Sequence, residues 1–498
     1  RALHDIQNKT PLFDYPGRLG DGPDFAVRLA TQALKTLIRV SHDLAHDLGN
    51  DKLLARTLRW LRSAVWPVMR RLAQRSVSAH RFWLGLDFMI AFLSGVIEDG
   101  VLLEGGFDKI DEYDFREWLL MHGAHHETVE APFGRMIYDA AFSYVDGEAK
   151  DQKIAAGVAV HILFGFGMYR GSMYYKMQSG MGDTVFAPLY QLLKKRGVKF
   201  EFFSKVEELH LAANGRDVGR VSLTRQAKLE PGREEYDPLI PVKGLECWPA
   251  EPNYDQLEHA DELRKVDLES YYQSPPAPEP FELVAGEDYD TLVFGIPIGA
   301  VPLLCKQLVD DNDRWKGMVK HVKSVQTASF QIWLKEGLAE LGWPMPPPLL
   351  SLFVEPLNTW ADMTQVLPTE DWPEGLEPKG VHYFTGPQPG PEFAPHPDDD
   401  PDFETRQTAT AKQLALEYLR TSLTDLLPNA VDSAGPPPSF NWNLLVDPAN
   451  GQGEASFDRQ YWRSNCGPSE RCTLALPKST KHRMPAGDTG YRNLVVTG

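Results

Sequence analysis

Two glycines close together mark the part of this chain that most strongly suggests ligand binding. Gly180 and Gly182 flank Met181. A glycine lets the backbone turn tightly or approach a ligand because it has no Cβ atom. Asp183 follows, and aspartate is a residue type that commonly caps the N-terminus of a helix. The pattern predicts a glycine loop in front of a helix, where a ligand could meet main-chain groups.

Three histidines offer a different chemistry. His122, His125 and His126 are spaced so that, on one helix, they could share a metal ion. Gly123 interrupts such a helix, and no HExxH pattern accompanies the histidines. We therefore favour a solvated helix end and predict no metal site. No nucleophile with a histidine and an acid stands out either, so the sequence identifies no catalytic residue.

A second glycine run, from Gly165 to Gly171, follows the apolar residues 158–164 with the spacing GxGxxxG. A dinucleotide-binding loop needs a strand before such a run and a helix directly after it. No helix-forming stretch follows directly here. We interpret the run as a closely packed backbone turn, with a dinucleotide loop as the alternative.

Periodicity predicts the elements that position the first glycine pair. Apolar residues between Val185 and Leu193 repeat at helical spacing. Three cations at 194–196 suit the last turn of that helix, and Gly197 stands where a left-handed residue commonly ends one. Residues 198–203 are rich in Val and Phe, so we expect a strand there that continues through 205–208.

Residues 169–209 resemble a segment of the flavin-containing amine oxidase and phytoene desaturase superfamily, in which a glycine run, a helix and an RGV turn lead into a strand. Residues 289–297, YDTLVFGIP, are similar to the superfamily's YDxVVxAxP strand. Their continuous hydrophobicity predicts a strand buried on both faces. Residues 468–498 are similar to its C-terminal motif, except that Lys478 stands in place of a glycine.

The resemblance implies an α/β fold with a discontinuous, Rossmann-like FAD-binding domain and a substrate domain of helices and mixed sheet. It implies FAD as the cofactor, with the main chain of one valine at the adenine. The residues that it places at the cofactor are Gly180, Met181, Gly182, Val206, Pro297 and Gly498.

The superfamily also has an N-terminal GxGxxG unit, which places the cofactor pyrophosphate at a helix N-terminus. No such unit opens this sequence, residue 1 is not Met, and the family's Asp-Trp does not follow Gly498. We therefore expect a chain that is truncated at both ends, and inactive alone.

Four regions are expected from these segments. Residues 1–168 are predicted to be a helical substrate-binding region, with helices at 25–48, 53–72 and 81–97. Residues 169–305 belong to the FAD-binding domain and carry a polar insertion at about 225–285. Residues 306–460 form a mixed α/β substrate-binding domain, and residues 461–498 return to the FAD-binding domain.

The apolar stretch at 81–97 bears on the substrate. It is short for a membrane span of about 20 residues and contains Asp87. A buried helix is the favoured interpretation. The alternatives are the wall of a lipid-sized tunnel around Phe92, a peripheral membrane contact and a true span.

Composition excludes some partners. Lys and Arg number 51 against 69 for Asp and Glu, so the net charge is −18, which argues against nucleic acid. Four scattered cysteines favour a reduced, cytoplasmic compartment, and membrane association stays open.

The expected function is an FAD-dependent oxidoreductase that removes a hydride equivalent from a C–H bond of a small hydrophobic, polyene or lipid-like substrate. Gln331 stands where some amine oxidases of the superfamily have a lysine. This weakens the alternative of amine oxidation at a C–N bond. A non-catalytic binding protein on the same fold and a membrane-associated carrier of hydrophobic ligands are the further alternatives.

Overall fold

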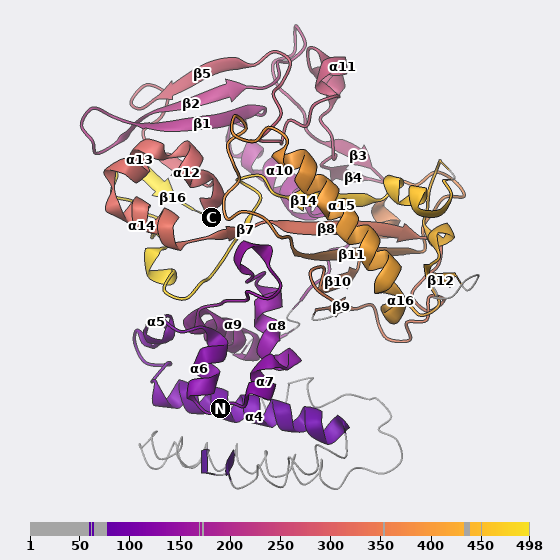
Figure 1. The fold of residues 1–498 in the computed structure, drawn as a ribbon. Helices are drawn as coiled ribbons and strands as arrows, with labels where there is room; N and C mark the ends of the chain where they lie inside the picture. The colour runs from indigo at the N-terminus through magenta and orange to yellow at the C-terminus, as the bar shows by residue number, and fades with distance from the viewer. Residues whose placement is uncertain are drawn as a thin grey trace. The chain divides into compact units, whose positions relative to one another are not determined.

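The computed structural model describes residues 59–60, 62–63 and 77–497, with gaps at 169, 172–173, 352–353, 433–438 and 450. Helices and sheets are mixed, as an α/β class requires, and Figure 1 shows their arrangement. The chain divides into two compact units: Arg1–Ser143, Gln152–Tyr174 and Ala475–Lys481 form unit 1, and Tyr144–Asp151, Tyr175–Leu474 and His482–Gly498 form unit 2. The helix predicted at 25–48, most of that at 53–72, and Gly498 lie outside the described residues.

Unit 1 is helical where it is described. Its helices are α4 (Val77–Glu98), α5 (Gly106–Ile110), α6 (Phe115–Met121), α7 (His126–Glu130), α8 (Pro132–Ala140) and α9 (Ala156–Met168). The apolar stretch at 81–97 is therefore helical, as predicted. Its core gathers buried side chains of α4, α6 and α9 around Phe92 and Trp118.

The GxGxxxG run is neither a turn nor a dinucleotide loop at its start, because α9 continues through residue 168. A Cβ atom at Gly165 would meet nothing within 4 Å, so no close approach forces the backbone to turn there. The local helical preference of the apolar residues before it extends the helix instead.

The larger sheet of unit 2 has the antiparallel order β14-β8-β11-β10-β9. Its strands are β8 (Thr327–Leu334), β9 (Leu349–Leu350), β10 (Thr359–Asp362), β11 (Gly380–Pro387) and β14 (Tyr461–Asn465). Helix α15 (Phe403–Thr421) packs on this sheet, where the ring of Tyr418 lies 5.8 Å from Phe330 and 5.0 Å from Phe384.

The smaller sheets of unit 2 hold the segments with the superfamily resemblance. Strands β1 (Ser204–Leu211), β2 (Val218–Arg225) and β5 (Glu279–Val284) form an antiparallel sheet, with β1 at its edge. Strand β6 (Leu292–Phe294) pairs in parallel with β16 (Leu494–Val496). Helices α12 (Val301–Leu304), α13 (Lys306–Asp311) and α14 (Asp313–His321) share one apolar core with both sheets.

The remaining elements are short. They are α10 (Ala187–Lys195), α11 (Ala260–Leu263), α16 (Leu423–Leu426), β3 (Ile240–Val242), β4 (Leu245–Cys247), β7 (Ser324–Val325), β12 (Val431–Asp432), β13 (Ser439–Phe440), β15 (Cys472–Thr473), the π-helical turn η2 (Gly182–Phe186), and the 3-10 turns η1 (Val145–Gly147), η3 (Tyr254–Gln256), η4 (Ile298–Ala300), η5 (Thr364–Thr369), η6 (Trp442–Leu444), η7 (Gly453–Arg459) and η8 (Thr480–His482).

The strand predicted at 198–203 and 205–208 is confirmed only in its second part, because β1 begins at Ser204. Phe203 has a φ of +54°, a left-handed conformation that interrupts an extended chain. Pairing with β2 starts directly after it, at Ser204 opposite Arg225. The helix before it ends as predicted, since Gly197 has a φ of +84°.

Candidate cofactor site and a buried charge cluster

The glycine pair lies in a turn that its own neighbours close. Asp183 is not a helix cap: one carboxylate oxygen accepts a hydrogen bond from Ser179 Oγ (2.9 Å) and the other from the Trp248 amide (3.0 Å). The Gly180 carbonyl accepts the amides of Asp183 (3.1 Å) and Thr184 (3.0 Å). The side chain of Asp183 thus ties the turn to the residue that follows β4.

Close approach explains why glycine stands at both positions. Neither Gly180 nor Gly182 is among the residues with positive φ. A Cβ atom at Gly180 would lie 2.9 Å from the Asp183 carboxylate, and one at Gly182 would lie 3.1 Å from Trp248 Cβ. A larger residue at either site would therefore push this carboxylate or this indole away.

Val206 and Pro297 belong to a different neighbourhood from the glycine turn. Val206 pairs with Leu223 on edge strand β1 and packs against the core that β6 and β16 share. Pro297 follows β6, and its carbonyl accepts the amide of Ala300 (3.0 Å). By contrast, the neighbour of Gly182 in the glycine turn is Trp248. Gly498 lies outside the described residues.

Strands β6 and β16 are adjacent although they are far apart in the sequence. Leu292, Val293 and Phe294 pair in parallel with the last described strand, and the Thr497 amide donates to the Phe294 carbonyl (2.9 Å). The expectation that this strand is buried on both faces was wrong, because Val293 is 62% exposed. Phe294 points into the core, whereas the face that carries Val293 is uncovered among the described residues.

Helix α10 also has an apolar face that the described residues leave uncovered. Its inner face buries Ala187 and Tyr190, and the Tyr190 ring lies 5.5 Å from that of Trp248. The exposed apolar side chains of this region are Met181, Val185, Phe186, Leu189, Leu192 and Val198. A contiguous exposed apolar patch commonly marks a packing or binding surface.

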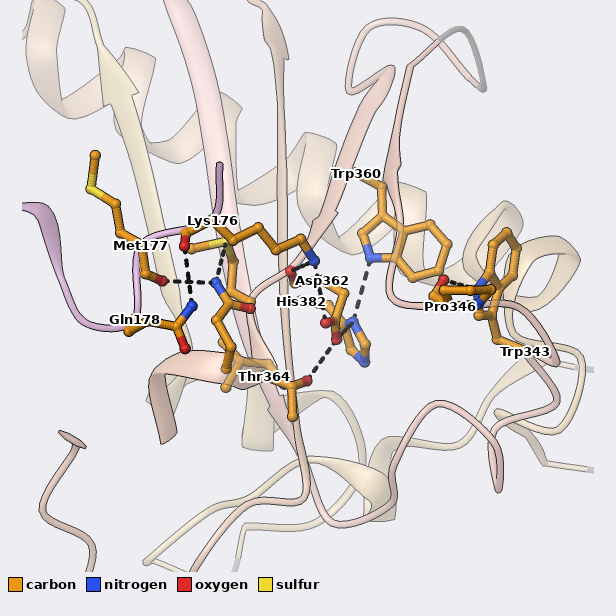
Figure 2. Close-up of polar contacts among 12 residues, drawn as sticks. Lys176, Met177, Gln178, Trp343, Pro346, Trp360, Asp362, Thr364 and His382 are labelled. Carbon is orange, nitrogen blue, oxygen red and sulfur yellow. Dashed lines mark hydrogen bonds and ion pairs between the residues drawn. The ribbon is translucent and has the colours of Figure 1, made fainter. Parts of the chain in front are cut away.

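A buried charge cluster lies where β10 and β11 pair in the larger sheet, and Figure 2 shows its members. The ammonium of Lys176 lies 2.6 Å from the Asp362 carbonyl and 3.6 Å from the Asp362 carboxylate. Thr364 Oγ1 donates to the same carboxylate at 2.6 Å. His382, opposite Asp362 in the β10–β11 register, has Nδ1 3.7 Å from this carboxylate.

The imidazole of His382 is fully buried, and Trp360 and the Asp362 carboxylate both lie near its Nδ1. Trp360 Nε1 donates to its Nδ1 at 3.4 Å, which places the ring proton on Nε2, where no hydrogen-bond partner is present. Burial lowers the pKa of His382 from 6.5 to about 4, while the Asp362 carboxylate opposes this shift and Lys176 adds to it. His382 is therefore neutral at pH 7.

The stability of the protein is expected to fall in acid because of His382. A histidine whose folded-state pKa is lowered contributes stability above its unfolded pKa, near 6.5, and loses it as the pH falls through about 4. The loss amounts to roughly 3 kcal/mol. Urea unfolding across this pH range should show a shallower pH dependence in His382→Gln than in the wild type. His396→Gln, which changes a more exposed histidine, should match the wild type, and parallel curves for all three proteins would contradict the assignment.

Sequence reasoning missed this cluster. Asp362 and His382 are separated by 19 residues that follow no catalytic spacing, and only their strand register brings them together.

His122 is buried and does not lie at a solvated helix end. Its Nδ1 lies 3.3 Å from Glu98 and its Nε2 lies 2.9 Å from Asp99. The main chain of His125 precedes α7 and donates its amide to Asp87 (2.8 Å). The described part of the chain contains no group of three or more residues that could hold a metal ion.

One serine–histidine pair resembles a nucleophile and base, but its protons are arranged the wrong way. His210 Nε2 lies 2.8 Å from Ser222 Oγ. The amide of Gln307 is oriented by the Leu211 N–H, which its oxygen accepts, so its nitrogen donates to His210 Nδ1. The proton of the neutral ring then lies on Nε2, and this histidine donates to the serine instead of accepting its proton.

The comparisons with known proteins identify no family. No protein-family model matches the chain, and no curated protein does. The chain is similar to a crystal structure of an oxidoreductase from Methanosarcina mazei, with a TM-score of 0.37 and 10% sequence identity over 81% of this chain and 67% of that one. At this TM-score the likeness establishes neither the fold nor the activity of this chain.

Proposed function

We propose that unit 2 contains the cofactor-binding part of an FAD-dependent oxidoreductase that removes a hydride equivalent from a C–H bond of a hydrophobic substrate. The parallel pairing of β6 with β16 carries the proposal. These two strands come from the segments that resemble the superfamily's cofactor-proximal strands, at 289–297 and 468–498. Parallel strands require a crossover connection, and this pairing is the one that a discontinuous Rossmann-like domain needs.

The uncovered surfaces of unit 2 support the same proposal. A two-stranded parallel sheet is not stable with one face in water, because parallel sheets are normally covered on both faces. Val293 on β6 and the outer face of α10 are apolar and exposed. We propose that a dinucleotide-binding βαβ unit covers these surfaces and contributes the pyrophosphate site.

The described residues fit an adenine-side contact. Strand β1 is an edge strand, so the main-chain groups on its open side can be reached by a ligand. Val206 lies on this strand, directly before a register shift between Val206 and Glu208. A bulge of this kind commonly re-aims groups next to a site. When bound, FAD would supply the hydride acceptor, and the protein would supply orientation and exclusion of water.

The proposal is tested by flavin content. The complete gene product is expected to purify yellow and to release FAD on denaturation. Insertion of one glycine after Val206 should lower flavin occupancy at least about tenfold, because a one-residue slip moves every main-chain group of the edge. Val206→Leu should leave the occupancy unchanged, and a glycine inserted at the exposed Gly215 turn between β1 and β2 is the matched control.

A complete gene product that is colourless and does not bind added FAD would sink the proposal. It would favour the alternative of a non-catalytic binding protein. If the protein does hold FAD, turnover of polyene and lipid-like substrates, measured beside that of primary and secondary amines, separates C–H oxidation from the amine oxidase alternative.

A further inference from the structure

The segment that leads into the glycine turn is attached along β10 and η5. Lys176 contacts Asp362 through both the carbonyl and the carboxylate. The next carbonyl is also held, because Gln365 Nε2 donates to that of Met177 (3.2 Å). Lys176 and Met177 are thus both attached to residues of β10 and η5 (Figure 2).

The Asp362 carboxylate, which pairs with the ammonium of Lys176, is itself held by neighbouring residues. Asp362 is 1% exposed, and Thr364 donates to one of its oxygens. The Thr364 hydroxyl in turn accepts the amide of Val381 (3.2 Å), and the His382 ring lies behind the carboxylate. A buried carboxylate is costly unless a cation or several hydrogen bonds compensate it. Lys176 supplies that cation, and its side chain is 30% exposed, so it is the movable member of the pair.

Only two residues separate the attached segment from the turn. Gln178 and Ser179 connect Lys176–Met177 to Gly180, and the Asp183 side chain ties the other end of the turn to Trp248. We propose that the Lys176–Asp362 pair fixes the position of the Gly180–Gly182 turn and so makes Lys176 and Asp362 positioning residues for the ligand that this turn meets. That the ligand is FAD rests on the proposed function; the tether itself does not.

The tether is tested by amide hydrogen exchange of the full chain at neutral pH. The amides of Asp183 and Thr184 donate to the Gly180 carbonyl and report on the turn. Lys176→Met keeps the aliphatic stem and removes the charge, and it should raise exchange of these amides about tenfold, since hydrogen bonds to charged groups are among the stronger ones. Lys176→Arg, which restores a cation, should keep the protection of the wild type.

A matched control comes from the same sheet. Lys379 forms an exposed pair with Glu336 (3.1 Å), and Lys379→Met should leave the exchange of residues 174–184 unchanged. Asp362→Asn should reproduce the effect of Lys176→Met; if it fails to fold, the lysine variants still decide. Unchanged exchange in Lys176→Met, or equal exchange in Lys176→Met and Lys379→Met, would overturn the tether.

Flavin binding separates the two proposals. If the wild type binds FAD, Lys176→Met should weaken that affinity about as much as it raises exchange, whereas Lys379→Met should not. Raised exchange with unchanged FAD affinity would overturn the positioning role. If the wild type binds no FAD, the proposed function fails, and the exchange result alone decides whether the tether exists.

Discussion

Replacing Arg471 with methionine is expected to destabilise the protein by about 2–6 kcal/mol. The guanidinium is 4% exposed and donates to the carbonyls of Cys466 (3.0 Å), Pro391 (2.6 Å) and Glu392 (3.1 Å) and to Gln326 Oε1 (3.3 Å). Methionine fills the volume of the stem but removes the donor from two buried acceptors, the Cys466 carbonyl and Gln326 Oε1, each at a cost of about 1–3 kcal/mol. Burial lowers the pKa of Arg471, yet guanidinium stays charged at any working pH.

Denaturant unfolding measures this loss. Arg471→Lys should be intermediate, because an ammonium has three donors and lacks the planar fork. Arg420→Met, which removes an exposed pair with Glu454, is the control and should cost less than about 1 kcal/mol. A loss below about 1 kcal/mol in Arg471→Met would show that water replaces the guanidinium and that the site is not dry.

Replacing Asp87 with leucine is expected to unfold unit 1, by a loss of about 3–5 kcal/mol. Asp87 is fully buried in α4, where it pairs with Arg62 and accepts hydrogen bonds from the His125 amide (2.8 Å) and Thr128 Oγ1 (2.6 Å). Removing one member of a buried ion pair leaves the other charge uncompensated. Leucine would leave Arg62, whose side chain is 15% exposed, in that position.

This substitution also separates the interpretations of α4. Residues 79–98 are the one helix among those described that is long and apolar enough to cross a membrane, and 56% of the apolar window is buried. In a membrane span, Asp87→Leu would favour insertion, since a central aspartate is costly there. In a core helix it lowers stability. Thermal unfolding measures the loss of stability, and a membrane-flotation assay measures membrane insertion. Met89→Leu, at a side chain that is 40% exposed, is the control.

The packing of Phe92 already favours the core interpretation. Its ring lies 6.2 Å from that of Trp118 and 5.6 Å from that of Phe164, within the buried cluster of unit 1. A charge at this position is therefore expected to disrupt folding and not only substrate binding, in contrast to the tunnel-wall alternative.

Local sequence pattern was sufficient to locate helices, although the predicted and observed ends differ. The helix predicted at 81–97 lies within α4. Gly197 was predicted to end α10 and does. Helices can be predicted in this way because their hydrogen bonds join residues four apart, so the determinants lie within one short window.

Strand pairing and the functions of single polar residues were decided only by the tertiary structure. β1 could not be placed from residues 198–203, because the left-handed Phe203 and the partner strand β2 determine where pairing begins. Asp183 was predicted to cap a helix, but its carboxylate accepts a hydrogen bond from the main-chain amide of Trp248, which is distant in the sequence. Asp362 and His382 meet through the register of β10 and β11. Each of these depends on segments that are distant in the chain, and a one-residue change of register would separate them.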